Sequence, residues 1–305
     1  MKELQDILAL FRRHRGEPMA LATLVQTTGS SYRRPGARML ITPQTQAGSL
    51  SGGCLEEEIA AVGRKVLQSG IPQLLHIDTR ARYGCHGALE VCVEHVSDDF
   101  LAAVDAACQA RIRCEVATFY GDGELGGSRV CDPDEPLPGA FIQCLEPCPR
   151  LVIIGSGPET ISLAAFAQVL GWEVEHTDRV CEIRGALDAF TAVVIGTHNY
   201  GRDFAALQML MPAPVAYLGL IGSRRRRDQL LCDLMDGNGE MPAGLHGPAG
   251  LDLGAETPEE IALAIVAEIQ ATLGHGNAQP LCRRNGPIHA AKQRPSIQPA
   301  LVAAR

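Results

Sequence analysis

The sequence predicts an α/β protein in two parts, a small N-terminal α+β domain followed by a domain built on a doubly wound parallel sheet. Its 305 residues exceed the usual size of one hydrophobic core. Before residue 120, short strand-like runs and helical patterns follow one another. After residue 150 the apolar runs are unbroken, which is typical of strands buried on both faces of a parallel sheet.

An amphipathic helix is expected at 1–15, because Leu4, Ile7, Leu8 and Phe11 recur on one helical face. This segment has no continuous apolar region of the kind found in secretory signals, so we expect the chain to stay in the cytoplasm. No segment has the roughly 18 consecutive apolar residues that a membrane span needs.

Strands and helices share the rest of the first domain. A helix is expected at 55–68, where Ile59 and Val66 belong to a helical repeat of apolar side chains and Gly70 with Pro72 ends the pattern. The other expected elements are a helix at 98–110 and strands at 19–26, 37–42, 73–77, 89–96 and 114–119.

Glycine and proline crowd residues 121–149, which have little periodicity, so we expect a linker there between domains at 1–120 and 150–275. A strand at 151–154, a glycine turn, a helix to about residue 170 and a strand around Val174 come next. This order is the βαβ start of a Rossmann-like domain. Two further strands of the parallel sheet are expected, at 192–195 and 215–218.

The last helix has clear signals at both ends. Thr257 is a suitable N-cap, Pro258 suits the first helical position, Glu260 completes a capping box, and Gly274 supplies the stop. The residues that follow are polar and include prolines, so we expect 276–305 to be a flexible tail or a partner-binding extension.

The composition excludes several classes of protein. A net charge of −8 and a pI near 5.6 do not indicate a general nucleic-acid partner. The basic run Arg224–Arg227 is interpreted as a solvated first helical turn.

Eleven cysteines in a chain without a secretory signal are expected to be thiols. Cys144 and Cys148 lack zinc-site spacing and a second pair, so no metal site is expected.

The second domain contains a glycine motif between a strand and a helix, where the pyrophosphate of a dinucleotide meets backbone N–H groups. Gly155 and Gly157 supply two of the three usual glycines, and Thr160, which should widen the helix–strand packing, takes the third position. Asp178 ends the second strand, and a carboxylate at this place can accept a hydrogen bond from a ribose hydroxyl. His198 follows a later strand and is the best-placed general base. A nucleotide site and a Rossmann-like fold without nucleotide both remain open, as does a structural role for the histidine.

A turn rich in small residues places Ser31, Arg33, Arg34 and Arg38 close together in the first domain. Arginine recognises phosphate through two parallel hydrogen bonds, and small residues let a ligand approach the backbone. The segment therefore predicts a phosphate-binding turn. An exposed basic hairpin without a ligand is the alternative.

Two glycine-flanked cysteines follow in the same domain. Gly52 and Gly53 precede Cys54 at the start of a helix, where the helix dipole favours the thiolate. Cys85 lies in a second glycine-flanked turn. If the two thiols meet, they can hold a soft metal or receive sulfur, whereas each one alone is more often a buried small residue.

These segments together resemble the XdhC/CoxI family of xanthine dehydrogenase accessory proteins. The resemblance extends from about residue 20 to 273 and departs from the family pattern at Gly157-Pro158-Glu159, where the family has a glycine turn of the GxGHV type, and in the short segment before Cys85. The segments that carry it are 29–39, 51–56, 194–199, 217–225 and 250–262.

The resemblance implies a protein that binds the molybdenum cofactor, a molybdopterin with or without an added nucleotide. It implies presentation of that cofactor to a cysteine desulfurase for sulfuration and delivery to an apo molybdenum hydroxylase of the xanthine dehydrogenase type. It also implies a homodimer. No Walker phosphate loop, HExxH or GxSxG motif is present, so we expect an accessory factor without turnover of its own.

Two other functions stay open at this point. An NAD(P)-dependent oxidoreductase would use Gly155, Gly157 and Asp178 for the cofactor and His198 as base. A carrier or sensor of copper or another soft metal would use the cysteines.

Overall fold

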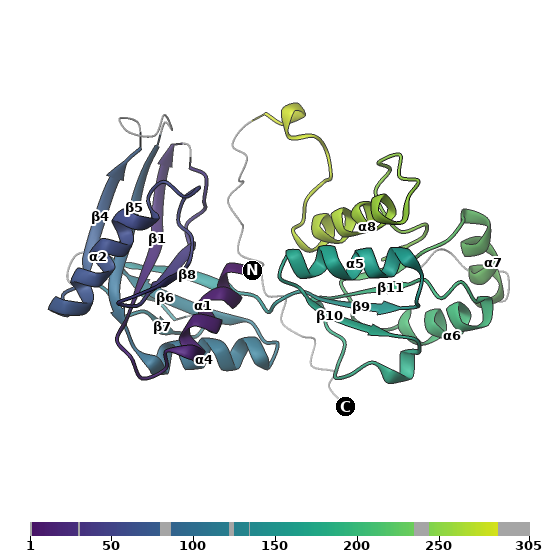
Figure 1. Cartoon of the computed structure of the whole chain (residues 1–305), viewed down its shortest axis with the longest axis horizontal. Helices are drawn as coiled ribbons and strands as arrows, with labels where there is room; N and C mark the ends of the chain where they lie inside the picture. Colours follow the sequence, from purple (N-terminus) through teal and green to yellow (C-terminus); the bar gives the residue numbers. More distant parts are fainter. Residues whose placement is uncertain are drawn as a thin grey trace.

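The computed structural model describes residues 2–29, 31–79, 87–121, 125–133, 135–234 and 244–285. It has an N-terminal unit of antiparallel strands and helices and a second unit built on a parallel sheet, which lie side by side (Figure 1). The mixed α/β architecture with a Rossmann-like second unit confirms the predicted fold class.

A five-stranded antiparallel sheet forms the centre of the N-terminal unit. Its strand order is β3-β2-β1-β5-β4, and the long central pair β1–β5 extends from Met19 opposite Val96 to Gly29 opposite Gly87. The strands are β1 (Met19–Gly29), β2 (Arg38–Ile41), β3 (Gln46–Gly48), β4 (Gln73–Asp78) and β5 (Gly87–Val96).

Helices cover the two faces of this sheet differently. Helix α2 (Glu56–Ser69) packs on one face, where Leu55 and Ile59 share a buried cluster with Met39 of β2. Helices α1 (Lys2–Arg13) and α4 (Asp98–Gln109) pack on the other face around Leu40. Successive residues of β2 therefore face different cores, as the period of two in a strand requires.

A second, three-stranded sheet lies on the α1 and α4 side. Its order is β7-β6-β8, with β6 at Cys114–Phe119, β7 at Arg129–Val130 and β8 at Ala140–Leu145. Both outer strands fall in the stretch 121–149 that we expected to be a linker. The glycines and prolines there mark the turns beside these strands, and the partly buried residues of β8 satisfy their backbone groups by pairing with β6.

The second unit is a five-stranded sheet whose neighbouring strands run parallel, in the order β10-β9-β11-β12-β13. Helices α5 (Pro158–Val169) and α8 (Pro258–Leu273) share the core on one face, and α6 (Tyr200–Leu210) and α7 (Arg224–Leu234) share the core on the other. The strands are β9 (Arg150–Ile154), β10 (Glu173–Thr177), β11 (Thr191–Ile195), β12 (Tyr217–Leu220) and β13 (Leu245–His246).

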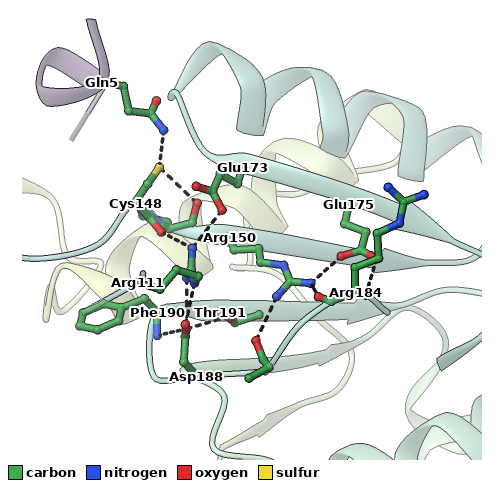
Figure 2. Close-up of polar contacts among 12 residues, drawn as sticks. Gln5, Arg111, Cys148, Arg150, Glu173, Glu175, Arg184, Asp188, Phe190 and Thr191 are labelled. Atoms are coloured by element: carbon green, nitrogen blue, oxygen red, sulfur yellow. Dashed lines mark hydrogen bonds and ion pairs between the residues drawn. The ribbon is translucent and has the colours of Figure 1, made fainter. Parts of the chain in front are cut away.

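The two units meet at the amino ends of β9, β10 and β11. Arg111, which follows α4, donates to Asp188 with Nε–Oδ2 of 2.6 Å, to Glu173 with Nη1–Oε2 of 3.0 Å and to the carbonyl of Cys148 (Figure 2). Gln5 of α1 reaches the Cys148 sulfur from the other side. Parallel strands that begin at this contact end on the far side of the sheet, away from the N-terminal unit (Figure 1).

No helix among the described residues is both long enough and apolar enough to cross a membrane.

Candidate functional site

Two loops of the N-terminal unit that sequence motifs singled out lie next to each other. The first joins β1 to β2 and carries Tyr32, which is exposed. The second precedes α2 and carries Gly52, whose Cβ position lies 4.0 Å from the Cδ1 atom of Tyr32. Ser31 supports the first loop by donating from Oγ to the carbonyl of Arg33 at 2.7 Å.

Cys54 is presented by the second loop to solvent. Its Sγ donates to Oγ of Ser51 at 3.6 Å, and Gly53 before it has a φ of +105°, a conformation that favours glycine. We expected Cys54 in the first turn of the helix, but α2 begins at Glu56 with Leu55 as its N-cap residue. The thiol therefore stands just outside the helix.

Cys54 differs from the other described cysteines of the N-terminal unit, because it alone among them is exposed. Burial raises the pKa of Cys92 to about 12 and that of Cys108 to about 11. These groups remain thiols at neutral pH, since desolvation disfavours a thiolate. Cys85, the expected second thiol of the site, lies outside the described residues.

Glu56 shapes the loop that carries Cys54. Its Oε1 accepts from Oγ of Ser49 at 2.8 Å and from the N–H groups of Leu50 and Ser51 at 3.2 and 2.9 Å. Its Oε2 accepts from Oγ of Ser51 at 2.7 Å and from the N–H of Leu55 at 3.1 Å. Burial alone would raise the pKa of Glu56, but the hydrogen bonds from Ser51 and Ser49 outweigh it and lower the pKa to about 2. The carboxylate of Glu56 thus holds the loop that leads into α2.

The three arginines of the first loop do not meet at one ligand site. Arg33 forms a two-point ion pair with Glu3 of α1, with Nη1–Oε1 of 2.6 Å. Arg38 is buried and donates to the carbonyl of Gly36 and the side chain of Gln143. Arg34 is exposed, and its side chain has no partner among the described residues. Of these three arginines, only Arg34 is thus both exposed and without a side-chain partner in the part of the chain that the structure describes.

Arg38 also lies on the wrong side of the sheet to act with Cys54. It shares a face with Leu40, which packs against α1 and α4, whereas Cys54 leads into α2 on the opposite face. Burial lowers the pKa of Arg38 to about 10, and its Nε and Nη2 atoms have no hydrogen-bond partner within the described chain. A buried guanidinium of this kind cannot meet a phosphate in solvent.

The glycine loop of the second unit lies at the carboxyl end of the parallel sheet. Gly155 has a φ of +133°, and a Cβ at this position would overlap the carbonyl oxygen of Gly196, so only glycine fits there. Gly157 is the N-cap residue of α5. Glu159, in the first turn, is buried, and its Oε1 lies 2.7 Å from Nε2 of His198.

The remaining residues expected in a nucleotide site surround this loop. Asp178 follows β10, is exposed, and lines an open groove of about 980 Å³ together with Ser156. Thr160 is fully buried and donates from Oγ1 to the carbonyl of Gly157 at 2.5 Å. The first turn of α5 therefore accommodates a threonine in place of the third glycine. His198 adopts a φ of +54°, an unusual value for a residue with a side chain.

Models of two parts of one family match the chain. The XdhC and CoxI family model matches residues 12–78, and the XdhC Rossmann domain model matches residues 151–269. A probable xanthine dehydrogenase subunit of Bacillus subtilis (strain 168) is 30% identical over 317 residues, which cover 84% of this chain and 93% of that protein. The chain belongs to the XdhC and CoxI family.

Two further similarities support the same family. The molybdenum cofactor insertion chaperone PaoD of Escherichia coli (strain K12) is 27% identical to this XdhC-family chain over 281 residues, with 85% of each protein covered. A crystal structure described as a xanthine dehydrogenase from Bacillus halodurans superimposes with a TM-score of 0.77 at 25% identity, covering 93% of this chain and 99% of that one.

The sequence motifs located the loop before α2 and the glycine loop before α5, but they did not reveal the carboxylate that contacts each loop. Glu56 stands in the motif that ends with Cys54-Leu55-Glu56, and Glu159 stands in the departure Gly157-Pro158-Glu159. Each acidic residue lies in the first turn of a helix, which was the available signal, because carboxylates are favoured at helix N-termini. What each carboxylate contacts depends on the loop conformation, and spacing does not encode that.

Proposed function

We propose that this XdhC-family protein is an accessory factor of a molybdenum hydroxylase. In this proposal it binds the molybdenum cofactor in the cytoplasm as a homodimer, presents it to a cysteine desulfurase for sulfuration, and passes it to the apo-hydroxylase. Support comes from the family and from the names of the relatives in Bacillus subtilis and Escherichia coli.

The observation that carries the proposal is the exposed Cys54 thiol on a loop that adjoins the loop of Arg34. The cofactor has a phosphate at one end and a sulfur-bound molybdenum at the other, and when delivered it supplies the metal centre of the hydroxylase. A free guanidinium fits the phosphate, and a thiol fits the sulfur-rich end. Arg34 would hold the phosphate, and Cys54 would contact the other end.

The two alternative functions have less support from the described residues. No group of three or more His, Cys, Asp and Glu side chains among them is arranged to hold a metal ion. For an NAD(P)-dependent reaction, the expected base His198 is engaged by Glu159 inside the glycine loop.

The test is cofactor retention by single variants expressed in cells that make the cofactor. We expect Arg34→Ala to weaken binding at least about tenfold, because hydrogen bonds to charged groups contribute roughly 1.5–3 kcal/mol. Cys54→Ser should weaken it as well, because a hydroxyl does not replace a thiol as a soft ligand. Molybdenum per chain by mass spectrometry and pterin fluorescence after oxidative extraction are the measurements. Unfolding midpoints should match wild type, since both side chains are exposed.

Matched controls exist in the second unit. Cys181→Ser removes another exposed thiol, and Arg202→Ala removes another exposed guanidinium. Both should retain wild-type molybdenum and pterin. Equal retention in folded Cys54→Ser and Arg34→Ala proteins would reject the proposed site, and absence of pterin from wild type would reject the function.

A further inference from the structure

The glycine loop of the second unit keeps the shape of a dinucleotide cradle but contains a negative charge of its own. In Rossmann folds the second position of the motif is glycine because a side chain there would keep the pyrophosphate from the backbone. That residue here is Gly157, and a Cβ at its position would overlap Oε1 of Glu159 and lie 2.8 Å from Oε2. The carboxylate of Glu159 therefore fills the space beside Gly157 that a phosphate would otherwise occupy.

Two elements hold Glu159 in this position. Its own helix α5 places it in the first turn, where it is only 7% exposed. His198, at the carboxyl end of the neighbouring strand β11, binds Oε1 through Nε2 at 2.7 Å. The pair lies where the strand order reverses between β9 and β11, which is the usual place for a ligand in an open α/β sheet.

We propose that Glu159 is a built-in anion that closes the phosphate cradle of the Rossmann half, so that this half of the protein rejects dinucleotides. A pyrophosphate placed at Gly157 would meet a carboxylate of the same charge and would have to displace it from His198. Juxtaposed like charges of this kind are a recognised means of rejecting a ligand.

The rest of the cradle is intact, so within the described residues Glu159 is the group that obstructs it. Gly155 makes the required close turn, and Thr160 fits at the third glycine position without an unpartnered hydroxyl. Asp178, the expected ribose acceptor, is exposed and has no side-chain partner among the described residues. Removing the carboxylate should therefore restore binding rather than destroy the site.

The experiment is calorimetric titration of the full-length protein with NAD⁺ and with ADP. We expect wild type to bind both more weakly than about 1 mM and Glu159→Ala to bind at least about tenfold more tightly. Glu159→Gln should give a smaller gain, since the amide loses the charge but still fills the space. Asp178→Ala on top of Glu159→Ala should abolish the gain, because the ribose acceptor is then missing.

A matched control removes the same charge elsewhere. Glu259 is an exposed glutamate in the first turn of α8, and Glu259→Gln should bind like wild type. Tight NAD⁺ binding by wild type would overturn the proposal. It would also be overturned if folded Glu159→Ala and Glu159→Gln both bound as weakly as wild type, and the Gln variant keeps the test decisive if Ala fails to fold.

Discussion

At the scale of single residues, the conformation of the loop that carries Cys54 depends on the charge of Glu56. The loop groups that bond to its carboxylate are two serine hydroxyls and three backbone N–H groups, all within residues 49–55. Protonation removes acceptor capacity from one oxygen, so the loop loses contacts when Glu56 becomes neutral. The position of the Cys54 thiol should therefore depend on pH in the acidic range.

This gives a prediction with a definite sign. The folded-state pKa of Glu56, about 2, lies below the ordinary value of 4.5, so its ionised form stabilises the folded chain above about pH 4.5, and this contribution is lost as pH falls toward 2. We expect Glu56→Gln to be less stable than wild type at neutral pH and the difference to shrink below about pH 4.5. Denaturant unfolding of both proteins across this range measures it.

The neighbouring Glu57 supplies the control for that measurement. It is exposed and accepts a long hydrogen bond from Gln46 at 3.5 Å, so Glu57→Gln should follow wild type at every pH. A constant stability difference between Glu56→Gln and wild type would show that the carboxylate charge does not organise the loop.

The sequence predicted residue types at the site better than it predicted their partners. An arginine-rich turn and a cysteine that follows two glycines are local features of the sequence, whereas the exposure of Cys54 is seen only in the structure. The partners of Arg33 and Arg38 come from α1 and β8, which are distant in sequence. Spacing along the chain holds no information about such contacts, so their engagement was not predictable.

At the scale of elements, helix α8 was predictable because its end signals are local. Thr257 accepts from the N–H of Glu260 at 3.3 Å, and Oε2 of Glu260 accepts from the N–H of Thr257 at 3.0 Å, which confirms the capping box. Strands β7 and β8 were missed for the opposite reason. They are held by pairing with β6, and strand preference depends on such neighbours more than on intrinsic propensity.

The capping box allows a quantitative prediction. We expect Thr257→Ala to lower the free energy of unfolding by about 1 kcal/mol, because the N–H of Glu260 loses its acceptor at the start of α8. Thr257→Ser keeps the hydroxyl, and because serine caps a helix at least as well as threonine, it should lose clearly less, as judged by chemical denaturation. Equal losses in the two variants would mean that the methyl group, and not the cap, stabilises this end.

At the scale of the whole molecule, the structure separates two groups of residues that the motifs placed in one cofactor-binding set. Cys54 and Arg34 belong to the N-terminal unit, whereas Gly157 and His198 lie at the carboxyl end of a parallel sheet that faces away from it (Figure 1). Sequence motifs predicted both units but not their relative placement, because that depends on a few contacts between distant segments. One chain therefore presents two separate surfaces.

The contact that fixes this placement centres on Arg111. Its guanidinium is largely buried between the units and reaches Asp188 through both Nε and Nη2, at 2.6 and 3.1 Å. Burial would raise the pKa of Asp188, but hydrogen bonds from Arg111 and Thr191 outweigh it and lower the pKa. Asp188 is thus ionised at neutral pH, so the ion pair is fully formed there.

Loss of Arg111 should uncouple the two units. We expect wild type to unfold in one calorimetric transition and Arg111→Ala in two, because a charge-assisted contact worth roughly 1.5–3 kcal/mol is removed while each unit keeps its own core. Arg129→Ala is the control, since Arg129 pairs with Glu135 within the N-terminal unit. It should leave a single transition. A single transition at the wild-type midpoint in Arg111→Ala would show that apolar packing, and not this ion pair, couples the units.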